Sequence, residues 1–405
     1  MSFLISPPAG EQPLGGSTPP QTAENAEIEK TIGVAKSQLD QFNHDKRLAE
    51  AFRLVDIYSD LKATIRRHYG GQVVTNAWLK IYEIVGMMGL GLTARSPIAA
   101  PHHTYVLRAF CNAELPGAFI CSLSQYICTT YPNTRFEWVG SSLYPDPENT
   151  AGREGSGGGG EILGDYYGLY ARNPDRWLMS PEMRGDVTKV EDIRALVAGA
   201  KARLGQVDLY TSDAGIGVSD DYLRQEETTA PIHLGQTVVG LMSLRKGGVM
   251  VVKTYTFVHP SSISLMAVCA SVFDSFYVTK PVTSRPANSE VYIVGIGFHG
   301  LTPEHEEHLL AAVEKFDFSR TLTVLGTPET EHTEQALLAA GTEIHKKQQV
   351  AFLEEALAFY KSYRHGMQDL RAHLRPAARK AQSEWIKQNN PIRLPTSCHI
   401  PGNDW

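Results

Sequence analysis

The chain has 405 residues and a formal net charge of −6; 42% of the residues are hydrophobic and 20% are charged. These proportions exclude a wholly disordered chain, because they supply enough apolar side chains for a substantial core, and the length suggests two or three domains. The negative charge excludes a uniformly basic surface for nucleic acid but not a local basic region, and no apolar run is long enough to span a membrane.

Residues 1–24 are rich in Pro, Gly, Ser and Thr, which predicts a disordered tail. Apolar residues then recur at helical spacing over residues 26–42 and 48–65, so we expect a helical N-terminal module over residues 25–70. The first residues lack a basic segment followed by an apolar one. No secretory signal is therefore expected, and we assign the protein to the cytoplasm.

Strand-like and helix-like segments alternate from about residue 105. The predicted strands are 106–113, 136–142, 208–213 and 248–255, and the predicted helices are 116–130, 190–204, about 222–245 and 261–274. This alternation predicts an α/β fold with a parallel sheet. Two further predicted strands, 276–281 and 290–297, are too close in sequence for a helical crossover, so the last strand should be antiparallel. We assign residues 71–300 to this domain.

Two other segments differ from the sheet domain in composition. Residues 153–161 are almost entirely Gly, Ser and charged residues, which predicts a flexible insertion. Residues 301–405 are predicted to form a helical C-terminal module, with helices between Pro303 and about Lys387.

The five cysteines include no CxxC pair; they are Cys111, Cys121, Cys128, Cys269 and Cys398. An odd number at wide spacing argues against a disulfide framework and against a zinc site. We therefore expect reduced thiols in the core and no bound metal.

Three ionisable residues should meet at one edge of the sheet. Asp213 ends one predicted strand, Lys253 lies near the end of the next, and Glu290 begins the antiparallel strand. Open α/β sheets bind ligands at the carboxyl ends of their parallel strands, and an antiparallel strand begins at that same edge. A lysine beside Val-rich strands needs a carboxylate partner. A catalytic group and a structural Lys–Asp pair both fit this pattern.

The first strand–helix turn is Asn112-Ala-Glu-Leu-Pro-Gly117. Pro116 is suited to the first turn of a helix, and Gly117 would let a ligand approach the backbone. Asn112 and Glu114 could contact a polar cofactor, although an ordinary turn would look the same.

A literal GxGxxG pattern occurs at Gly295–Gly300. In a dinucleotide site this pattern opens a helix directly after a parallel strand. Here the next predicted helix begins only at Thr302-Pro303 and the strand is antiparallel, so the pattern favours a nicotinamide-dependent oxidoreductase only weakly.

The successive motifs resemble a known family. TSDAG (211–215), LRKGGVMVVKTY (244–255) and KPVTSRPANSEVYIV (280–294) resemble the FtsJ-like RNA ribose 2'-O-methyltransferases, and SRPANSE is especially similar to the eukaryotic cap 1 enzymes. The upstream segments TNAWLKIYE (75–83) and AFCNAELPGAF (109–119) resemble the FtsJ-like methyltransferases of African swine fever virus and related large DNA viruses.

The resemblance implies a Rossmann-like sheet, S-adenosylmethionine as cofactor, and a catalytic tetrad of Lys80, Asp213, Lys253 and Glu290. It also implies a set of cofactor-binding residues: Asn112, Glu114, Pro116, Gly117, Ala118 and Phe119 near the methionine end, Asp186 near the adenine, and Asp213. Two departures weaken the cofactor assignment. Ala118 stands where the family has a second glycine, and Ser141 and Ser142 stand where it has an acidic residue for the ribose.

The implied substrate is capped RNA, which would be methylated on the first transcribed nucleotide, with other capping enzymes as possible partners. Residues 361–393 have eight Lys and Arg against two Asp and Glu. Arg371, Arg375 and Arg379 from this stretch, with Arg285 and Asn288 from the SRPANSE motif, are the predicted RNA contacts. A solvated helix face would also explain the basic stretch. A ribosomal or transfer RNA methyltransferase and a non-catalytic RNA- or cap-binding subunit remain alternatives.

Overall fold

The computed structural model describes residues 1–5, 22–42, 44–89, 97–100, 103–145, 164–215, 224–319, 331–363 and 365–402. The predicted insertion at 153–161 and most of the predicted tail lie outside these residues. No helix within the described part of the chain is long and apolar enough to cross a membrane.

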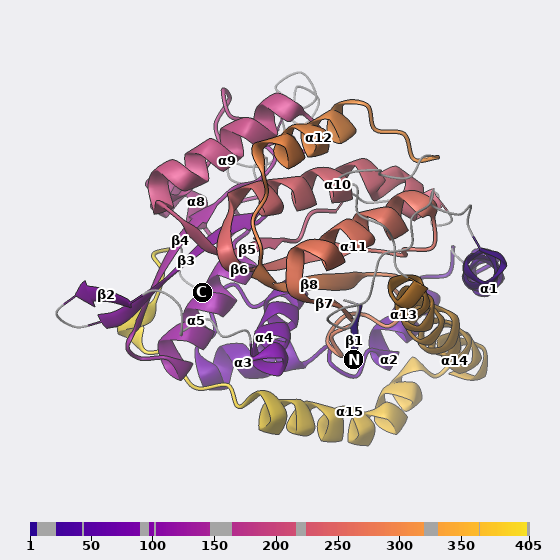
Figure 1. The fold of residues 1–405 in the computed structure, drawn as a ribbon. Helices are drawn as coiled ribbons and strands as arrows, with labels where there is room; N and C mark the ends of the chain where they lie inside the picture. Colours follow the sequence, from indigo (N-terminus) through magenta and orange to yellow (C-terminus); the bar gives the residue numbers. More distant parts are fainter. Residues whose placement is uncertain are drawn as a thin grey trace.

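A single sheet forms the centre of the described structure, with the strand order β1-β7-β8-β6-β5-β3-β2 and with β4 also paired to β3 (Figure 1). The parallel strands are β3 (His103–Asn112), β4 (Thr134–Gly140), β5 (Val207–Ser212) and β6 (Leu244–Thr254). The strands β1 (Ser2–Leu4), β2 (Pro97–Ala100) and β8 (Val291–Phe298) run in the opposite direction, whereas β7 (Phe273–Thr279) runs with the parallel strands and pairs antiparallel with β1 and β8. This topology confirms the predicted α/β sheet and its antiparallel last strand.

Helices cover both faces of the sheet (Figure 1). One face packs against α9 (Val190–Leu204), α10 (Gln225–Ser243), α11 (Pro260–Val272) and α12 (Pro303–Glu314). The other packs against α3 (Leu61–Tyr69), α4 (Asn76–Met88) and α5 (Ala118–Thr130). Burial on both faces explains why all six residues of β5 are buried, including the polar residues Asp208, Thr211 and Ser212.

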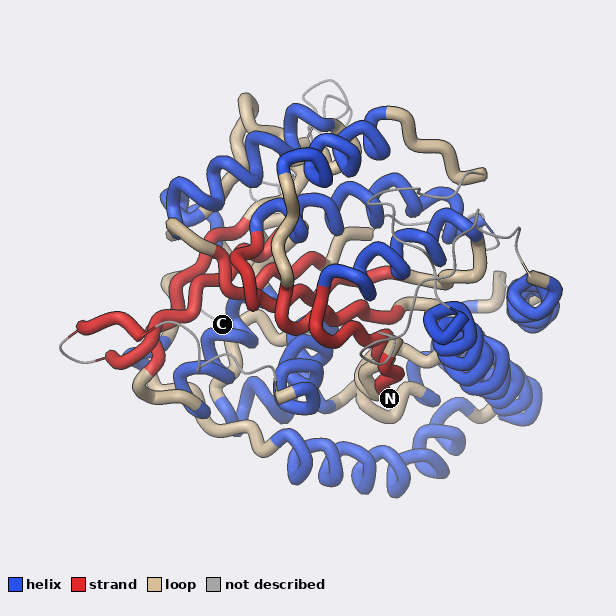
Figure 2. Tube along the Cα trace, in the orientation of Figure 1, coloured by secondary structure: helices blue, strands red, loops and turns tan. Residues whose placement is uncertain are grey.

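The helices before and after the sheet pack against each other. They are α1 (Ala23–Asp40) and α2 (Lys46–Val55) before it, and α13 (Glu331–Gly341), the π-helical segment Thr342–Gln349, α14 (Val350–Tyr363) and α15 (Met367–Asn389) after it (Figure 2). Leu48 and Ala51 of α2 share a core cluster with Leu357 and Tyr360 of α14. The predicted second helix over 48–65 is divided into α2 and α3 at Asp56, whose carboxylate accepts a hydrogen bond from the Tyr58 N–H.

The first residues differ from the prediction. Ser2–Leu4 were expected within a disordered tail, but they form β1 and pair antiparallel with β7, and Ile5 is fully buried. The reason is long-range: β7 would otherwise be an edge strand with unpaired backbone groups, and Ile5 adds apolar surface to the core. Composition alone, dominated by the Pro- and Gly-rich residues that follow, does not reveal this pairing.

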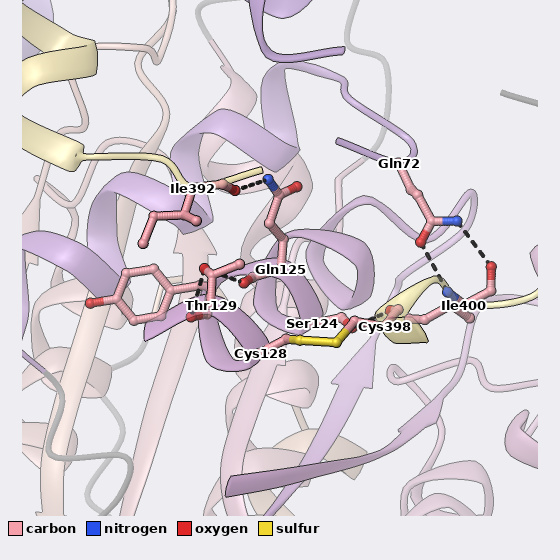
Figure 3. Close-up of a disulfide and its surroundings, with 9 residues drawn as sticks. Gln72, Ser124, Gln125, Cys128, Thr129, Ile392, Cys398 and Ile400 are labelled. Carbon is pink, nitrogen blue, oxygen red and sulfur yellow. Dashed lines mark hydrogen bonds between the residues drawn. A yellow bond between two sulfur atoms is a disulfide. The ribbon is translucent and has the colours of Figure 1, made fainter. Parts of the chain in front are cut away.

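The expectation of reduced thiols is wrong for two cysteines. Cys128, near the end of α5, forms a disulfide with Cys398, and their Cα atoms are 6.6 Å apart (Figure 3). The C-terminal segment returns to α5, where Gln125 donates to the carbonyl of Ile392 at 2.8 Å and Gln72 donates to that of Ile400 at 3.0 Å. Sequence spacing does not show this return. The other three cysteines are free and buried, as expected.

Candidate active site

Four ionisable residues meet at the carboxyl edge of the sheet. Ser212 of β5 lies opposite Val252 of β6, so Asp213 and Lys253 follow side by side. Lys253 in turn lies opposite Tyr292 of β8, which puts Glu290 just beyond the end of β6. Lys80 comes from α4, a helix whose first turn is capped by the hydroxyl of Thr75. The structure thus brings all four residues of the predicted tetrad together.

These four side chains form two separate ion pairs. The Nζ of Lys80 lies 2.6 Å from the Oε1 of Glu290. The Nζ of Lys253 lies 3.2 Å from the Oδ1 of Asp213 and donates to the Asp213 carbonyl at 2.6 Å. Lys80, Lys253 and Glu290 are buried, whereas the Asp213 side chain remains 19% exposed.

The electrostatics of the site favour the charged forms of Lys253 and Glu290. Burial lowers the pKa of the Lys253 ammonium, but the negative charges of Asp213 and Glu290 outweigh burial and raise the pKa above its ordinary value. Burial would raise the pKa of Glu290, but the ammonium groups of Lys80, Lys253 and Lys280 hold that pKa well below its usual range. At neutral pH the resting site therefore contains a protonated Lys253.

Tyr292 is a site residue that was not predicted. Its hydroxyl donates to the Oδ1 of Asp213 at 2.8 Å, and the Nζ of Lys80 lies 5.9 Å from the centre of its ring. Burial and the charges of Asp213 and Glu290 raise the pKa of Tyr292, so its hydroxyl keeps its proton as a donor. Two-residue periodicity could have suggested it, because residues two apart in a strand share a face and Tyr292 follows Glu290 by two.

Glu83 and Lys280 were also missed. Glu83 lies three residues after Lys80 on α4, and its carboxylate accepts hydrogen bonds from the N–H groups of Val282 and Thr283 at 2.7 and 3.3 Å. It also accepts from the indole N–H of Trp385 in α15 at 3.3 Å. Lys280 binds backbone carbonyls of the loop before Glu290. These contacts fix residues 281–290 beside α4, and nothing in a single sequence identifies them.

The first strand–helix turn is supported by its own polar side chains. Asn112 donates to the hydroxyls of Tyr210 and Ser212, both at 3.2 Å, and accepts from Ser141 at 2.7 Å. Glu114 is buried and accepts from the N–H of Ile120 at 2.9 Å. Burial raises the pKa of Glu114 well above its usual range. The hydrogen bond from the Ile120 N–H opposes this shift, and the charge of Asp213 adds to it.

Pro116 does not occupy the predicted first turn of the helix. The helix α5 begins at Ala118, and Gly117 is its N-cap with φ of 105°, a left-handed conformation that favours glycine. A Cβ at Gly117 would also lie 2.1 Å from the Cδ2 of Leu169. The side chains of Ala118 and Phe119 are buried in the core, so these two residues could face a ligand only through their backbone.

Known proteins resemble this chain over most of its length. Residues 167–298 match the FtsJ-like methyltransferase family. The chain is 35% identical over 403 residues to "Probable methyltransferase EP424R" of African swine fever virus, and the alignment covers 94% of this chain and 89% of that protein. The chain belongs to the FtsJ-like methyltransferase family.

Two more distant relatives share parts of the chain. "Uncharacterized protein L511" of Acanthamoeba polyphaga mimivirus is 32% identical over 259 residues, which cover 63% of this chain and 30% of that protein. "Cap-specific mRNA (nucleoside-2'-O-)-methyltransferase 2" of Drosophila melanogaster is 26% identical over 278 residues, which cover 68% of this chain and 37% of that protein.

FtsJ-like methyltransferases use S-adenosylmethionine, and the residues of the first turn suit it. The sulfonium and the amino group of this cofactor are positively charged, and the carboxylate of Asp213 lies at the edge of the sheet beside the turn. Burial raises the pKa of Glu114, so its carboxyl group suits a hydrogen bond to the cofactor rather than a charge contact. Asp186 is half-buried on the segment before α9, where its Oδ1 accepts from the N–H and hydroxyl of Thr188 at 2.9 and 2.7 Å. Its other carboxylate oxygen could accept a hydrogen bond from an adenine amino group.

The GxGxxG pattern lies at the opposite edge of the sheet in this methyltransferase. Ile296 pairs with Val249, near the start of β6, whereas Lys253 lies near its end. A Cβ at Gly297 would lie 2.0 Å from the Oδ2 of Asp274, and its φ is 78°, so a glycine is required there by packing and backbone conformation. The GxGxxG pattern therefore does not support the oxidoreductase alternative.

The predicted RNA contacts are exposed, and the four arginines among them line two adjoining cavities. Arg371, Arg375 and Arg379 share one exposed face of α15 and line a groove of about 700 Å³ with Arg53. Arg285 lines a neighbouring cavity of about 440 Å³, to which Arg53 also contributes. Asn288 is exposed on the same loop as Arg285.

Proposed function

We propose that this protein transfers a methyl group from S-adenosylmethionine to a ribose 2'-hydroxyl of RNA, and that its substrate is the first transcribed nucleotide of capped mRNA. The observation that supports this most strongly is the paired arrangement of Lys253 with Asp213 and of Lys80 with Glu290 at one edge of the sheet. An ammonium held by a carboxylate is suited to binding and orienting a neutral hydroxyl group.

Lys253 would position the attacking oxygen. Its Nζ already contacts the carbonyl and the carboxylate of Asp213, and the third N–H group can point toward a ribose hydroxyl. S-adenosylmethionine supplies an electrophilic methyl group on a positively charged sulfur. To accept the hydroxyl proton, Lys253 must first lose its own, and the nearby carboxylates oppose this loss. Lys253 would therefore release its own proton to solvent before the neutral amine accepts the proton of the hydroxyl.

The RNA would extend from this edge across the two cavities. Arg53, Asp56, Ser59 and Asp60 line both of them, which supports a continuous path from the loop of Arg285 to α15. Arginines on one helix face suit the phosphates of a single strand. The cavity nearer the tetrad also contains Phe52 and Phe352, whose apolar rings suit a base rather than a phosphate.

Cap specificity is the finer part of the proposal. It is supported by the 26% identity to a protein named for cap-specific mRNA methylation and by the presence of aromatic and cationic side chains in one cavity beside the catalytic loop. The enzyme would then act in the cytoplasm of a host cell, after enzymes that build and N7-methylate the cap. A ribosomal or transfer RNA substrate is the second candidate.

The test is transfer of labelled methyl from S-adenosylmethionine to short RNAs of one sequence that differ only at the 5' end. We expect incorporation into cap 0 RNA and none into cap 1 or uncapped RNA, with the label on the 2'-oxygen of the first nucleotide. Equal labelling of uncapped RNA, or of transfer or ribosomal RNA, would overturn the cap assignment. Absence of transfer to every RNA, with cofactor binding intact, would overturn the methyltransferase proposal.

A further inference from the structure

Lys280 is a buried lysine directly after β7 that the proposed chemistry does not use. Only 9% of its surface is exposed. Its Nζ lies 2.6 Å from the carbonyl oxygen of Asn288, 2.6 Å from that of Glu290 and 3.4 Å from that of Arg285. An ammonium has three N–H donors, and these three carbonyls can accept all of them.

This arrangement costs more than an apolar side chain would. Removing an ammonium from water is unfavourable unless nearby groups compensate. Burial lowers the pKa of Lys280 to about 7, with the charge of Glu290 opposing the shift and that of Lys80 adding to it. A methionine of similar length would fill the same space without this cost. Packing therefore does not explain a lysine at position 280.

The three carbonyls belong to the residues on which the proposed function depends. Glu290 pairs with Lys80, and its Oε1 also accepts from the hydroxyl of Ser284 at 2.8 Å. Arg285 and Asn288 are the exposed residues of the same loop. By binding the backbone at all three positions, one ammonium fixes the catalytic carboxylate and both predicted RNA contacts relative to the end of β7.

A second set of contacts fixes the same loop from the C-terminal helices. The amide group of Gln349 donates to the carbonyl of Ala287 at 2.8 Å and to the hydroxyl of Ser289 at 3.1 Å. Glu83 fixes Val282 and Thr283. These contacts lie at other positions of the loop, so Lys280 is distinguished by its direct bond to the Glu290 carbonyl.

We propose that Lys280 is a positioning residue whose ammonium holds the loop 281–290 so that Glu290 faces Lys80 and Lys253, with Arg285 and Asn288 turned toward the RNA. The proposal rests on the proposed function only for its effect on rate, because the effect on the loop can be measured without any substrate.

The test compares Lys280→Met with the control Lys201→Met, which changes an exposed lysine of α9. We expect Lys280→Met to lower kcat about tenfold or more, since small displacements of catalytic groups cost this much. The dissociation constant for S-adenosylmethionine should remain within about twofold of wild type, because Lys280 does not belong to the strand–helix turn 112–117 that is predicted to bind the cofactor. The control should match wild type in both. A kcat for Lys280→Met equal to that of wild type would overturn the proposal.

A double-mutant cycle with Glu290→Gln separates positioning from general destabilisation. If Lys280 acts through Glu290, Lys280→Met should cost little further activity once Glu290 is changed. An equal fall in both backgrounds would mean that Lys280 only stabilises the fold, and would overturn the proposal. Should Lys280→Met not fold, Lys280→Gln, which has a shorter neutral side chain, serves in its place with the same outcomes.

Hydrogen exchange of the free protein provides a readout that needs no activity. Amides of the non-proline residues among 282–290 should exchange at least about tenfold faster in Lys280→Met, while those of β5 and α9 remain unchanged. Unchanged exchange in the loop would overturn the proposal even if kcat falls. If wild type transfers no methyl group to RNA, the proposed function fails, and this exchange measurement still decides the role of Lys280.

Discussion

The side chains of Lys80 and Glu290 form a buried ion pair, with 2.6 Å between Nζ and Oε1, that joins a helix on one face of the sheet to the start of the antiparallel strand. Lys253 and Lys280 also lie near Glu290, so its carboxylate interacts with the ammonium groups of three lysines. The pair therefore links the position of α4 to the charge of the catalytic edge.

Removing one partner of this pair should destabilise the fold. Lys80→Met leaves a buried carboxylate with fewer compensating charges, and breaking such a pair costs about 3 kcal/mol. Glu290→Gln in the same chain should restore part of the lost stability, because it removes the uncompensated charge. Denaturant unfolding of the two single variants and the double variant measures this. Additive losses in the double variant would contradict the pairing.

The edge of the sheet that holds the proposed catalytic residues was predictable from sequence to the extent that strand ends define it. Asp213, Lys253 and Glu290 follow from the rule that parallel strands end, and an antiparallel strand begins, at one edge. Lys80 required the family resemblance, because a helix packed on the sheet face gives no register with the strands. Lys280 could not be recognised from the sequence, since its contacts depend on three carbonyls that only the folded loop brings together.

Long-range pairings were the other part that sequence could not provide. The disulfide joins cysteines whose sequence separation is 270 residues, and β1 pairs with a strand near the opposite end of the sheet domain. Neither leaves a local pattern, because periodicity and composition report only on neighbours in sequence. Side-chain contacts between distant residues also fix Asn112, and Glu114 supports the same strand–helix turn by a hydrogen bond to the Ile120 N–H.

Lys253→Ala should abolish methyl transfer and leave the fold intact. Loss of the ammonium removes the donor that orients the hydroxyl, whereas the cofactor turn is unchanged. We expect single-turnover transfer to fall at least about a thousandfold, as for loss of an orienting acid–base group. Calorimetric titration with S-adenosylmethionine should give wild-type affinity. Lys201→Ala, an exposed lysine of α9, serves as the control and should retain full activity. Retained activity in Lys253→Ala would exclude Lys253 as the catalytic lysine.

The raised pKa of Lys253 predicts a rate that increases with pH. Asp213 and Glu290 keep the ammonium protonated at neutral pH, so the fraction able to accept a proton grows as the pH approaches that raised pKa from below. We expect kcat/KM to rise about tenfold per pH unit between about pH 7 and 9 where proton transfer limits the rate. Asp213→Asn removes one stabilising charge and should shift the rise to lower pH. A flat profile in wild type would show that Lys253 acts only as a donor.

The arginines of α15 should contribute affinity rather than catalysis. Replacing Arg371, Arg375 and Arg379 by Ala removes three cations from one exposed helix face. For a single strand, log K against log salt should lose about 2 from its slope. The control replaces three exposed lysines elsewhere: Lys30 of α1, Lys201 of α9 and Lys315, the C-cap of α12. Fluorescence anisotropy with capped RNA at several salt concentrations gives the slope for the arginine variant and for the lysine control. Equal slopes would mean that the basic face of α15 is only solvated.

The disulfide should stabilise the fold without taking part in catalysis. Cys128 lies near the end of α5, whereas the cofactor turn precedes its first residue, so the bond is separated from the chemistry by the length of the helix. Cross-links between distant residues stabilise proteins by about 2–4 kcal/mol. Cys398→Ser should therefore lower Tm by several degrees, and dithiothreitol should lower the Tm of wild type to a similar value.

The matched control is Cys269→Ser, which changes a buried free thiol. Its Tm should still fall on reduction, whereas the Tm of Cys398→Ser should no longer respond. Methyl transfer to RNA at a temperature well below both transitions should be unaffected in Cys398→Ser. Thiol titration of the unfolded, unreduced protein should detect three of the five cysteines. Detection of all five would show that Cys128 and Cys398 are reduced in the protein as isolated, and the stabilising role assigned to their bond would then not apply.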